Sequence, residues 1–246
     1  MGPRGLFEFA RGIAQLIYPN ACLLCGAAEA DPCGFRHGLC LPCQRAVTDD
    51  PFETCPRCAA TVGPHTDVSN GCAACRDRSF RFAQTFRLGA YDGALRAAVL
   101  RMKHAPGEGL AEMMGRVAAE RLAAKLSTAM VGVVVPVPLH WWRRWARGYN
   151  QSAAVGREVA AALNLPFEER WLRRTKWTPQ AAQPSATARR ENIRGAFAVT
   201  SRASFAGARV LLVDDVMTTG STAGEAAREM LDAGADHVAV LVLARH

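Results

Sequence analysis

The strongest chemical signal in the sequence is a pair of neighbouring carboxylates followed by a turn of small and hydroxyl-bearing residues. Asp214 and Asp215 come directly after the apolar run Val210–Val213, and the turn Thr218–Thr222 begins after two further residues. Backbone N–H groups in such a turn attract a phosphate, and Gly220 allows a close backbone approach. The carboxylates can accept hydrogen bonds from sugar hydroxyls or hold a hydrated Mg²⁺. The stretch therefore predicts a sugar-phosphate site; the alternative is an ordinary helix cap.

The segments around this pair predict a parallel α/β sheet. Val210–Val213 run without alternation, as in a strand buried on both faces, and Val131–Val137 give a second such run. Further strands are expected over 82–88, 195–200, 208–213 and 237–243, with helices over 94–102, 108–126, 151–163 and 223–233. The order of strands and helices is that of an α/β fold in which the acidic pair lies near the end of a central strand.

A basic and aromatic segment follows the second predicted strand. Trp141–Asn150 contains three tryptophans, three arginines and Tyr149. The arginines could clamp a pyrophosphate and the rings could stack a base; alternatively, the tryptophans pack into a neighbouring element. For Arg147–Asn150 binding is the favoured interpretation, because ligands of α/β sheets bind at the carboxyl ends of strands.

A long basic stretch without clear periodicity, Trp171–Arg194, precedes the last strands. Its charged and amide side chains are Arg173, Arg174, Lys176, Gln180, Gln183, Arg189, Arg190, Asn192 and Arg194. A loop of this length inside a compact domain is typical of a lid or a binding surface. We expect a lid over a phosphorylated ligand, with a solvated charge run as the alternative.

The nine cysteines predict metal sites. All lie between Cys22 and Cys75, and eight of them form the C-x-x-C pairs Cys22/Cys25, Cys40/Cys43, Cys55/Cys58 and Cys72/Cys75. Two such pairs supply the four thiolates of a closed, structural Zn²⁺ site. We pair them sequentially, although an interleaved cross-brace would use the same residues. Cys33 is left as a free thiol, and His37 and His65 are expected to be loop residues rather than ligands.

Composition limits the class of protein. The 246 residues carry a formal net charge of +8, which favours polyanionic partners. No apolar run is long enough to span a membrane, and the N-terminus lacks a secretory signal, so we expect a cytoplasmic protein. The cysteines stop and β/α patterning begins near 76–81. We therefore expect a double zinc-ribbon domain over 1–80, opened by a short helix over 5–18, and a second domain over 81–246.

These segments together resemble the ComF (ComFC) family over essentially the whole chain. The matching stretches are Y-P-N-A-C-L-L-C-G (18–26), Y-D-G-A-L-R (91–96), M-K (102–103), V-P-V-P-L-H (135–140), R-G-Y-N-Q (147–151), R-R-E-N-I-R-G-A-F (189–197), V-L-L-V-D-D-V-M-T-T-G-S-T (210–222) and L-V-L-A-R (241–245). The stretch 210–222 also resembles the phosphoribosyl diphosphate (PRPP) loop of type I phosphoribosyltransferases. The resemblance implies a double zinc ribbon joined to a phosphoribosyltransferase-type domain, a parallel sheet flanked by helices.

The resemblance also implies roles for residues. Asp214 and Asp215 would contact the ribose hydroxyls as the catalytic pair, with Mg²⁺ accompanying PRPP. The turn would bind the 5′-phosphate through Thr218, Thr219, Gly220, Ser221 and Thr222. The pyrophosphate loop would contain Pro136, Val137, Pro138 and Leu139, near Arg147 and Asn150. The flexible lid would be 173–194, with Arg173, Arg174, Arg189 and Arg190.

Members of the family are linked to natural transformation, where they act on incoming single-stranded DNA with a helicase-like partner. One hypothesis is therefore a DNA-handling protein that binds PRPP or a related sugar phosphate, which the basic charge and the Arg/Trp segment favour. A second is an active phosphoribosyltransferase that transfers ribosyl phosphate from PRPP to a nitrogen base, although the sequence shows no recognisable acceptor pocket. A third, a zinc-ribbon adaptor with a degenerate enzyme domain, predicts no affinity for PRPP.

Overall fold

A computed structural model describes residues 21–28, 35–177 and 191–246. The predicted helix over 5–18 lies outside the described residues, as do Cys33, Arg189 and Arg190. The same is true of residues 178–190, the central part of the predicted lid.

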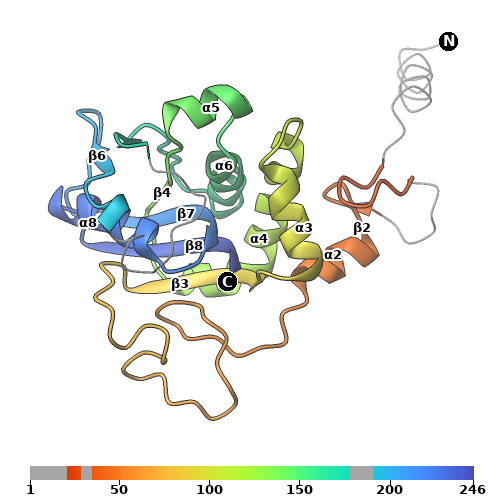
Figure 1. The fold of residues 1–246 in the computed structure, drawn as a ribbon, viewed down its shortest axis with the longest axis horizontal. Helices are drawn as coiled ribbons and strands as arrows, with labels where there is room; N and C mark the ends of the chain where they lie inside the picture. The colour runs from red at the N-terminus through yellow and green to blue at the C-terminus, as the bar shows by residue number, and fades with distance from the viewer. Residues whose placement is uncertain (1–20, 29–34, 178–190) are drawn as a thin grey trace.

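Four parallel strands form the centre of the molecule, in the order β3-β8-β7-β4 (Figure 1). Their bounds are Gln84–Ala90 for β3, Val133–Pro136 for β4, Arg209–Met217 for β7 and His237–Arg245 for β8. The two central strands, β7 and β8, are buried along most of their length, as their continuous apolar runs require. The α/β fold class is confirmed.

Helices cover both faces of the sheet. One face carries α3 (Gly93–Met102), α4 (Glu108–Thr128) and α6 (Gln151–Leu163), which share one core with Leu211 and Val213 of β7. The other face carries α8 (Ser221–Asp232) and the antiparallel ribbon β5–β6 (Leu172–Arg174 and Phe197–Val199). This second core contains Val210 and Leu212. Alternate residues of β7 thus serve opposite cores, as the pleat of a doubly covered strand dictates.

Three elements differ from the sequence expectation. β7 does not end at Val213 but continues to Met217, so the acidic pair lies inside the strand; pairing with β8 continues to Met217↔Arg245 and holds it extended. β5 was not predicted, because three residues are too short to show a period. The segment after β4 is helical (α5, Trp141–Arg147): the His140 ring nitrogen accepts from the Trp142 N–H, and Gly148 ends the helix at φ 85°.

The N-terminal part contains the short strands β1 (Phe35–Arg36) and β2 (Leu39–Cys40), the helix α2 (Leu41–Thr48) and the eight described cysteines. A buried ion pair joins it to the sheet. Arg87 of β3 donates to both carboxylate oxygens of Asp50, at 2.8 and 2.9 Å, and to the Ala59 carbonyl at 2.8 Å. The Arg87 side chain is only 2% exposed. Removing Asp50 would therefore leave a buried charge without its partner and lower the free energy of unfolding.

No helix in the described part of the chain combines the length and apolar character needed to cross a bilayer.

Candidate functional site

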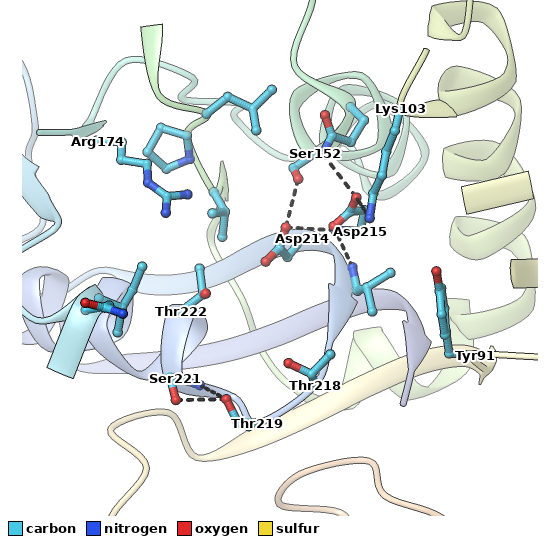
Figure 2. Close-up of a pocket in the computed structure, with 17 residues that line it drawn as sticks. Tyr91, Lys103, Ser152, Arg174, Asp214, Asp215, Thr218, Thr219, Ser221 and Thr222 are labelled. Carbon is cyan, nitrogen blue, oxygen red and sulfur yellow. Dashed lines mark hydrogen bonds and ion pairs between the residues drawn. The ribbon is translucent and has the colours of Figure 1, made fainter. Parts of the chain in front are cut away.

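A cavity of about 350 Å³ opens at the carboxyl edge of the sheet. Because all four strands are parallel, the residues that follow β3 and β4 meet the end of β7 at this edge. The cavity is lined by Tyr91, Lys103, Val137, Pro138, Leu139, Gln151, Ser152, Arg174, Asn192, Ile193, Asp214, Asp215, Val216, Thr218, Thr219, Ser221 and Thr222. Figure 2 shows the two carboxylates between the hydroxyl-rich loop on one side and Lys103 and Arg174 on the other.

Both carboxylates of the pair are held by hydrogen bonds. The Ser152 hydroxyl donates to Asp214 Oδ1 at 3.0 Å, and the Gln151 amide donates to Asp215 Oδ2 at 3.0 Å. Lys103 Nζ lies 3.3 Å from the same Asp215 oxygen (Figure 2). Two residues of the first turn of α6 and one from the end of α3 therefore orient the acids.

The electrostatics of the pair favour a cationic ligand. Burial, and then the neighbouring charge of Asp215, raise the pKa of Asp214 to about 7, whereas the bonds from the Asp215 N–H and Ser152 act in the opposite direction. Two adjacent carboxylates in a partly buried site repel each other. A divalent cation or a set of hydroxyl donors at Asp214 would relieve this repulsion.

The loop between β7 and α8 has the form of an anion site. Gly220 adopts a left-handed conformation with φ 76° and is the N-cap residue of α8. Because glycine has no side chain, this residue cannot accept a hydrogen bond from the N–H groups of the first helical turn, which can then face an anion. The hydroxyl oxygens of Thr219 and Ser221 lie 2.8 Å apart. The loop, together with Asp214 and Val242, encloses a hollow of about 30 Å³ beside the main cavity. A phosphate is the chemical group that these donors suit.

Only part of the predicted pyrophosphate and lid set lines the cavity. Val137, Pro138, Leu139, Arg174 and Asn192 line it with the acidic pair. Burial lowers the pKa of the Arg174 guanidinium, and the nearby charge of Arg143 acts in the same direction while Asp214 opposes it. Arg174 therefore lies near one positive charge, that of Arg143, and one negative charge, that of Asp214.

The remaining described members of that set do not line the cavity. Pro136 is buried at the end of β4, and Arg173 points outward on β5. Asn150 donates to the Val137 carbonyl at 3.0 Å and caps α6, so it shapes the wall of the cavity. Arg147 is hydrogen-bonded to Gln151, which in turn holds Asp215.

Several residues that line the cavity have no role predicted from the sequence. These are Tyr91, Lys103, Gln151 and Ser152. The first three lie in the stretches Y-D-G-A-L-R, M-K and R-G-Y-N-Q that carry the family resemblance, so a signal was present for them. Ser152 directly follows the last of these stretches.

The cysteines form two groups, Cys22, Cys25, Cys40 and Cys43, and Cys55, Cys58, Cys72 and Cys75. Within each group the sulfurs lie within 4.8 Å of one another, which is the grouping that sequential pairing predicts. Four of the S–S distances are 3.6 to 3.9 Å. A tetrahedron with Zn–S bonds of about 2.3 Å has edges of about 3.8 Å. Both groups therefore fit structural zinc, and His37 instead contacts Glu120 at 3.0 Å.

Comparison with known proteins agrees with this architecture. Residues 150–246 match the phosphoribosyl transferase domain family. The chain is 30% identical over 235 residues to DNA utilization protein YhgH of Salmonella typhi, covering 94% of this chain and 99% of that protein. It is 29% identical over 214 residues to competence protein F of Haemophilus influenzae, covering 85% and 91%.

Among solved structures, the glutamine phosphoribosylpyrophosphate (PRPP) amidotransferase of B. subtilis is similar, with 23% sequence identity and a TM-score of 0.38. The similarity covers 55% of this chain and 27% of that one. The match to YhgH extends over nearly the full length of both chains, through the cysteine groups and the phosphoribosyl transferase domain. The chain belongs to the ComF family, the family of competence protein F and YhgH.

Proposed function

We propose that the cavity binds PRPP or a closely related sugar phosphate together with Mg²⁺. The observation that carries the proposal is that Asp214 and Asp215 line one cavity with the loop Thr218–Thr222 at the N-terminus of α8. A phosphate bound by the loop would place an attached ribose next to the carboxylates. Their oxygens can accept hydrogen bonds from its hydroxyls or from the water shell of Mg²⁺.

The other end of the cavity suits a diphosphate. Lys103 and Arg174 lie on the far side of the carboxylates from Thr219 and Ser221 (Figure 2). PRPP carries anions at both ends of a neutral, hydroxyl-bearing ring, and the site carries anion-binding groups at both ends of an acidic middle. This agreement in the order of charges supports PRPP over a simple sugar monophosphate.

Calorimetric titration with PRPP in the presence of Mg²⁺ tests the proposal. Replacing Asp215 with asparagine removes one negative charge and the partner of Lys103, and it should weaken binding by at least about ten-fold. Asp236→Asn, an exposed acid in the connection before β8, is the matched control and should bind as the wild type does. Absence of PRPP binding by the wild type, or equal binding by both variants, would refute the proposed site.

We infer that the family role in DNA handling extends to this chain, since its relatives are named for competence and DNA utilization. The proposed surface for single-stranded DNA is α5, whose three tryptophans, Trp141, Trp142 and Trp145, are 67%, 50% and 74% exposed. Neighbouring rings in this set lie 5.4 to 5.7 Å apart, centroid to centroid. Unstacked bases stack on such rings, and the arginines of the same helix suit the phosphates.

The salt dependence of oligonucleotide binding tests the α5 surface. Replacing both Arg143 and Arg144 with alanine should lower the slope of log K against log salt by about 1.4, since each phosphate contact contributes about 0.7 on a single strand. The control removes two exposed charges from α4, at Arg121 and Lys125, and should leave the slope unchanged. Equal slopes for the two double variants would remove α5 from the proposal.

An active phosphoribosyltransferase is the second candidate function. The observation that favours it is the position of Asp214, which lines the cavity and is oriented by the Ser152 hydroxyl. Burial and Asp215 raise its pKa to about 7, where a group can both accept and release a proton near neutral pH. Pyrophosphate release from PRPP should then depend on an added nitrogen base and disappear in Asp215→Asn. A panel of bases that gives no release would leave PRPP as a bound ligand only.

We further infer that the protein works in the cytoplasm with zinc in both cysteine groups. The eight described cysteines are free thiols, and two groups of this shape fit tetrahedral metal sites. A reducing compartment keeps such thiols available to a metal.

A further inference from the structure

The cysteine group formed by Cys55, Cys58, Cys72 and Cys75, here the second group, is followed by Arg78. Arg78 is hydrogen-bonded to the loop between β7 and α8 (Thr218–Thr222), here called the phosphate loop. We propose that this group positions the loop through Arg78 and Arg245, so that integrity of the second group sets the affinity of the cavity for sugar phosphates. The affinity part rests on the proposed function; the positioning part does not require a ligand.

The first connection is made by Arg78, three residues after the last cysteine of the second group. Its guanidinium donates to the Thr219 carbonyl at 2.9 Å. Its own carbonyl accepts a bond of 3.1 Å from Arg57, which lies between Cys55 and Cys58. Arg78, which follows the Cys72–Cys75 turn, therefore connects Thr219 of the phosphate loop to Arg57 in the Cys55–Cys58 turn.

The second connection is made by Arg245 at the end of β8. Its Nε donates to the Cys58 carbonyl at 3.0 Å, and its NH1 lies 3.3 Å from the Met217 carbonyl, where β7 ends and the loop begins. Arg245 is only 6% exposed. Four thiolates around one divalent zinc carry a net charge of about −2, so a loaded group would compensate this buried cation.

The third contact is a ring that supports the loop from behind. A Cβ on Gly220 would lie 2.8 Å from Cε1 of Phe80, so the ring already touches the backbone of the loop. Phe80 stacks on Phe82 with ring centroids 4.6 Å apart, and the guanidinium carbon of Arg57 lies over the Phe80 ring, 5.8 Å from its centre. Two hydrogen-bond connections and one packing contact thus define the position of residues 217–220.

The other group of cysteines provides an internal comparison. Cys22 and Cys40 belong to the core that contains α3 and α4, and Arg101 of α3 donates to the Leu24 carbonyl within the Cys22–Cys25 turn. The contacts given above for this first group are therefore with helices on the side of the sheet opposite α8. Disturbing this group should leave the phosphate loop in place.

Hydrogen exchange measured on the full chain tests the positioning role. Arg78→Met removes the donor to the loop but keeps an apolar stem, and Arg81→Met removes an exposed charge from the same segment. We expect exchange at the amides of 217–222 to become about ten-fold faster in Arg78→Met and to stay unchanged in Arg81→Met. Affinity for PRPP should fall by about ten-fold in the first variant only, with zinc content unchanged in both.

Separate loss of each metal group completes the test. Cys58→Ser should release one zinc and speed exchange at 217–222, whereas Cys25→Ser in the first group should release zinc without that change. If Cys58→Ser does not fold, the comparison of Arg78→Met with Arg81→Met still decides. Unchanged loop exchange in Arg78→Met overturns the inference. If the wild type fails to bind PRPP, the proposed function fails, while the exchange result still measures the connection.

Discussion

Replacing Asp214 with asparagine should make the ligand-free protein more stable at pH 8 while it removes sugar-phosphate binding. The pKa of Asp214 is raised from 3.8 to about 7 by burial and by Asp215. The folded protein therefore binds more protons than the unfolded chain across this window, and stability is lost as the pH rises from about 4 to about 7. Asparagine keeps the shape of the side chain and carries no charge, so the variant lacks this loss.

The magnitude follows from the size of the shift. About three pKa units at about 1.4 kcal/mol each give a ceiling of about 4 kcal/mol. Because Asp214 opens onto the cavity, water screens the repulsion, and we expect about half of that value, or about 2 kcal/mol at pH 8. For a chain of this size such a gain raises Tm by about 4 to 8 °C. At pH 5 most of the repulsion is already relieved by protonation, so the gain should be smaller.

Differential scanning calorimetry at pH 5 and pH 8 measures this difference, with Asp236→Asn as the exposed control. Added PRPP and Mg²⁺ should raise the Tm of the wild type and of the control but not that of Asp214→Asn. A variant that is less stable than the wild type at pH 8, or that shows the same gain at both pH values, would refute the reasoning about the pair.

The remaining predictions concern the loop, the diphosphate end and the N-terminal ion pair. Gly220 has a φ of 76°, and a Cβ there would lie 2.8 Å from the Phe80 ring, so Gly220→Ala should destabilise the protein by about 1–2 kcal/mol in denaturant titration. Gly224→Ala, whose Cβ would enter open space, should not destabilise it. Lys103→Met should weaken PRPP binding by about ten-fold but leave ribose 5-phosphate binding nearly unchanged by calorimetry. Asp50→Asn leaves a buried arginine without its counter-charge and should cost about 3 kcal/mol on chemical unfolding, while the exposed neighbour Asp49→Asn should cost less than about 0.5.

The sequence was sufficient for features that depend on neighbouring residues. The unit of β7, the loop and α8 could be predicted because a buried run, a small turn and a helix follow one another directly. The α6 helix has the predicted bounds, Gln151–Leu163. The eight candidate metal ligands could be predicted because the C-x-x-C spacing sets the distance between the two thiols of a pair. Which two pairs share a site could not be decided from that spacing.

Features that depend on packing between distant segments could not be read in this way. Lys103 reaches Asp215 because α3 ends at the carboxyl edge of the sheet, and no local pattern shows where a helix ends in space. β5 forms because it pairs with β6 across residues 178–190, and its three residues carry no period. Arg147 was assigned to the pyrophosphate, but its bond to Gln151 makes it a support for the acidic pair in the ligand-free protein.

Hydrogen bonds from buried side chains cross the change in composition near 76–81. Arg87 of β3 and Arg245 of β8 are buried, and each donates to a carbonyl of the cysteine-rich part, at Ala59 and Cys58. Each guanidinium offers five donors, so one side chain can satisfy carbonyls that no strand could pair. Loss of these acceptors while the arginines stay buried would cost several kcal/mol. Buried hydrogen bonds therefore join the cysteine-rich part to the sheet that forms the cavity.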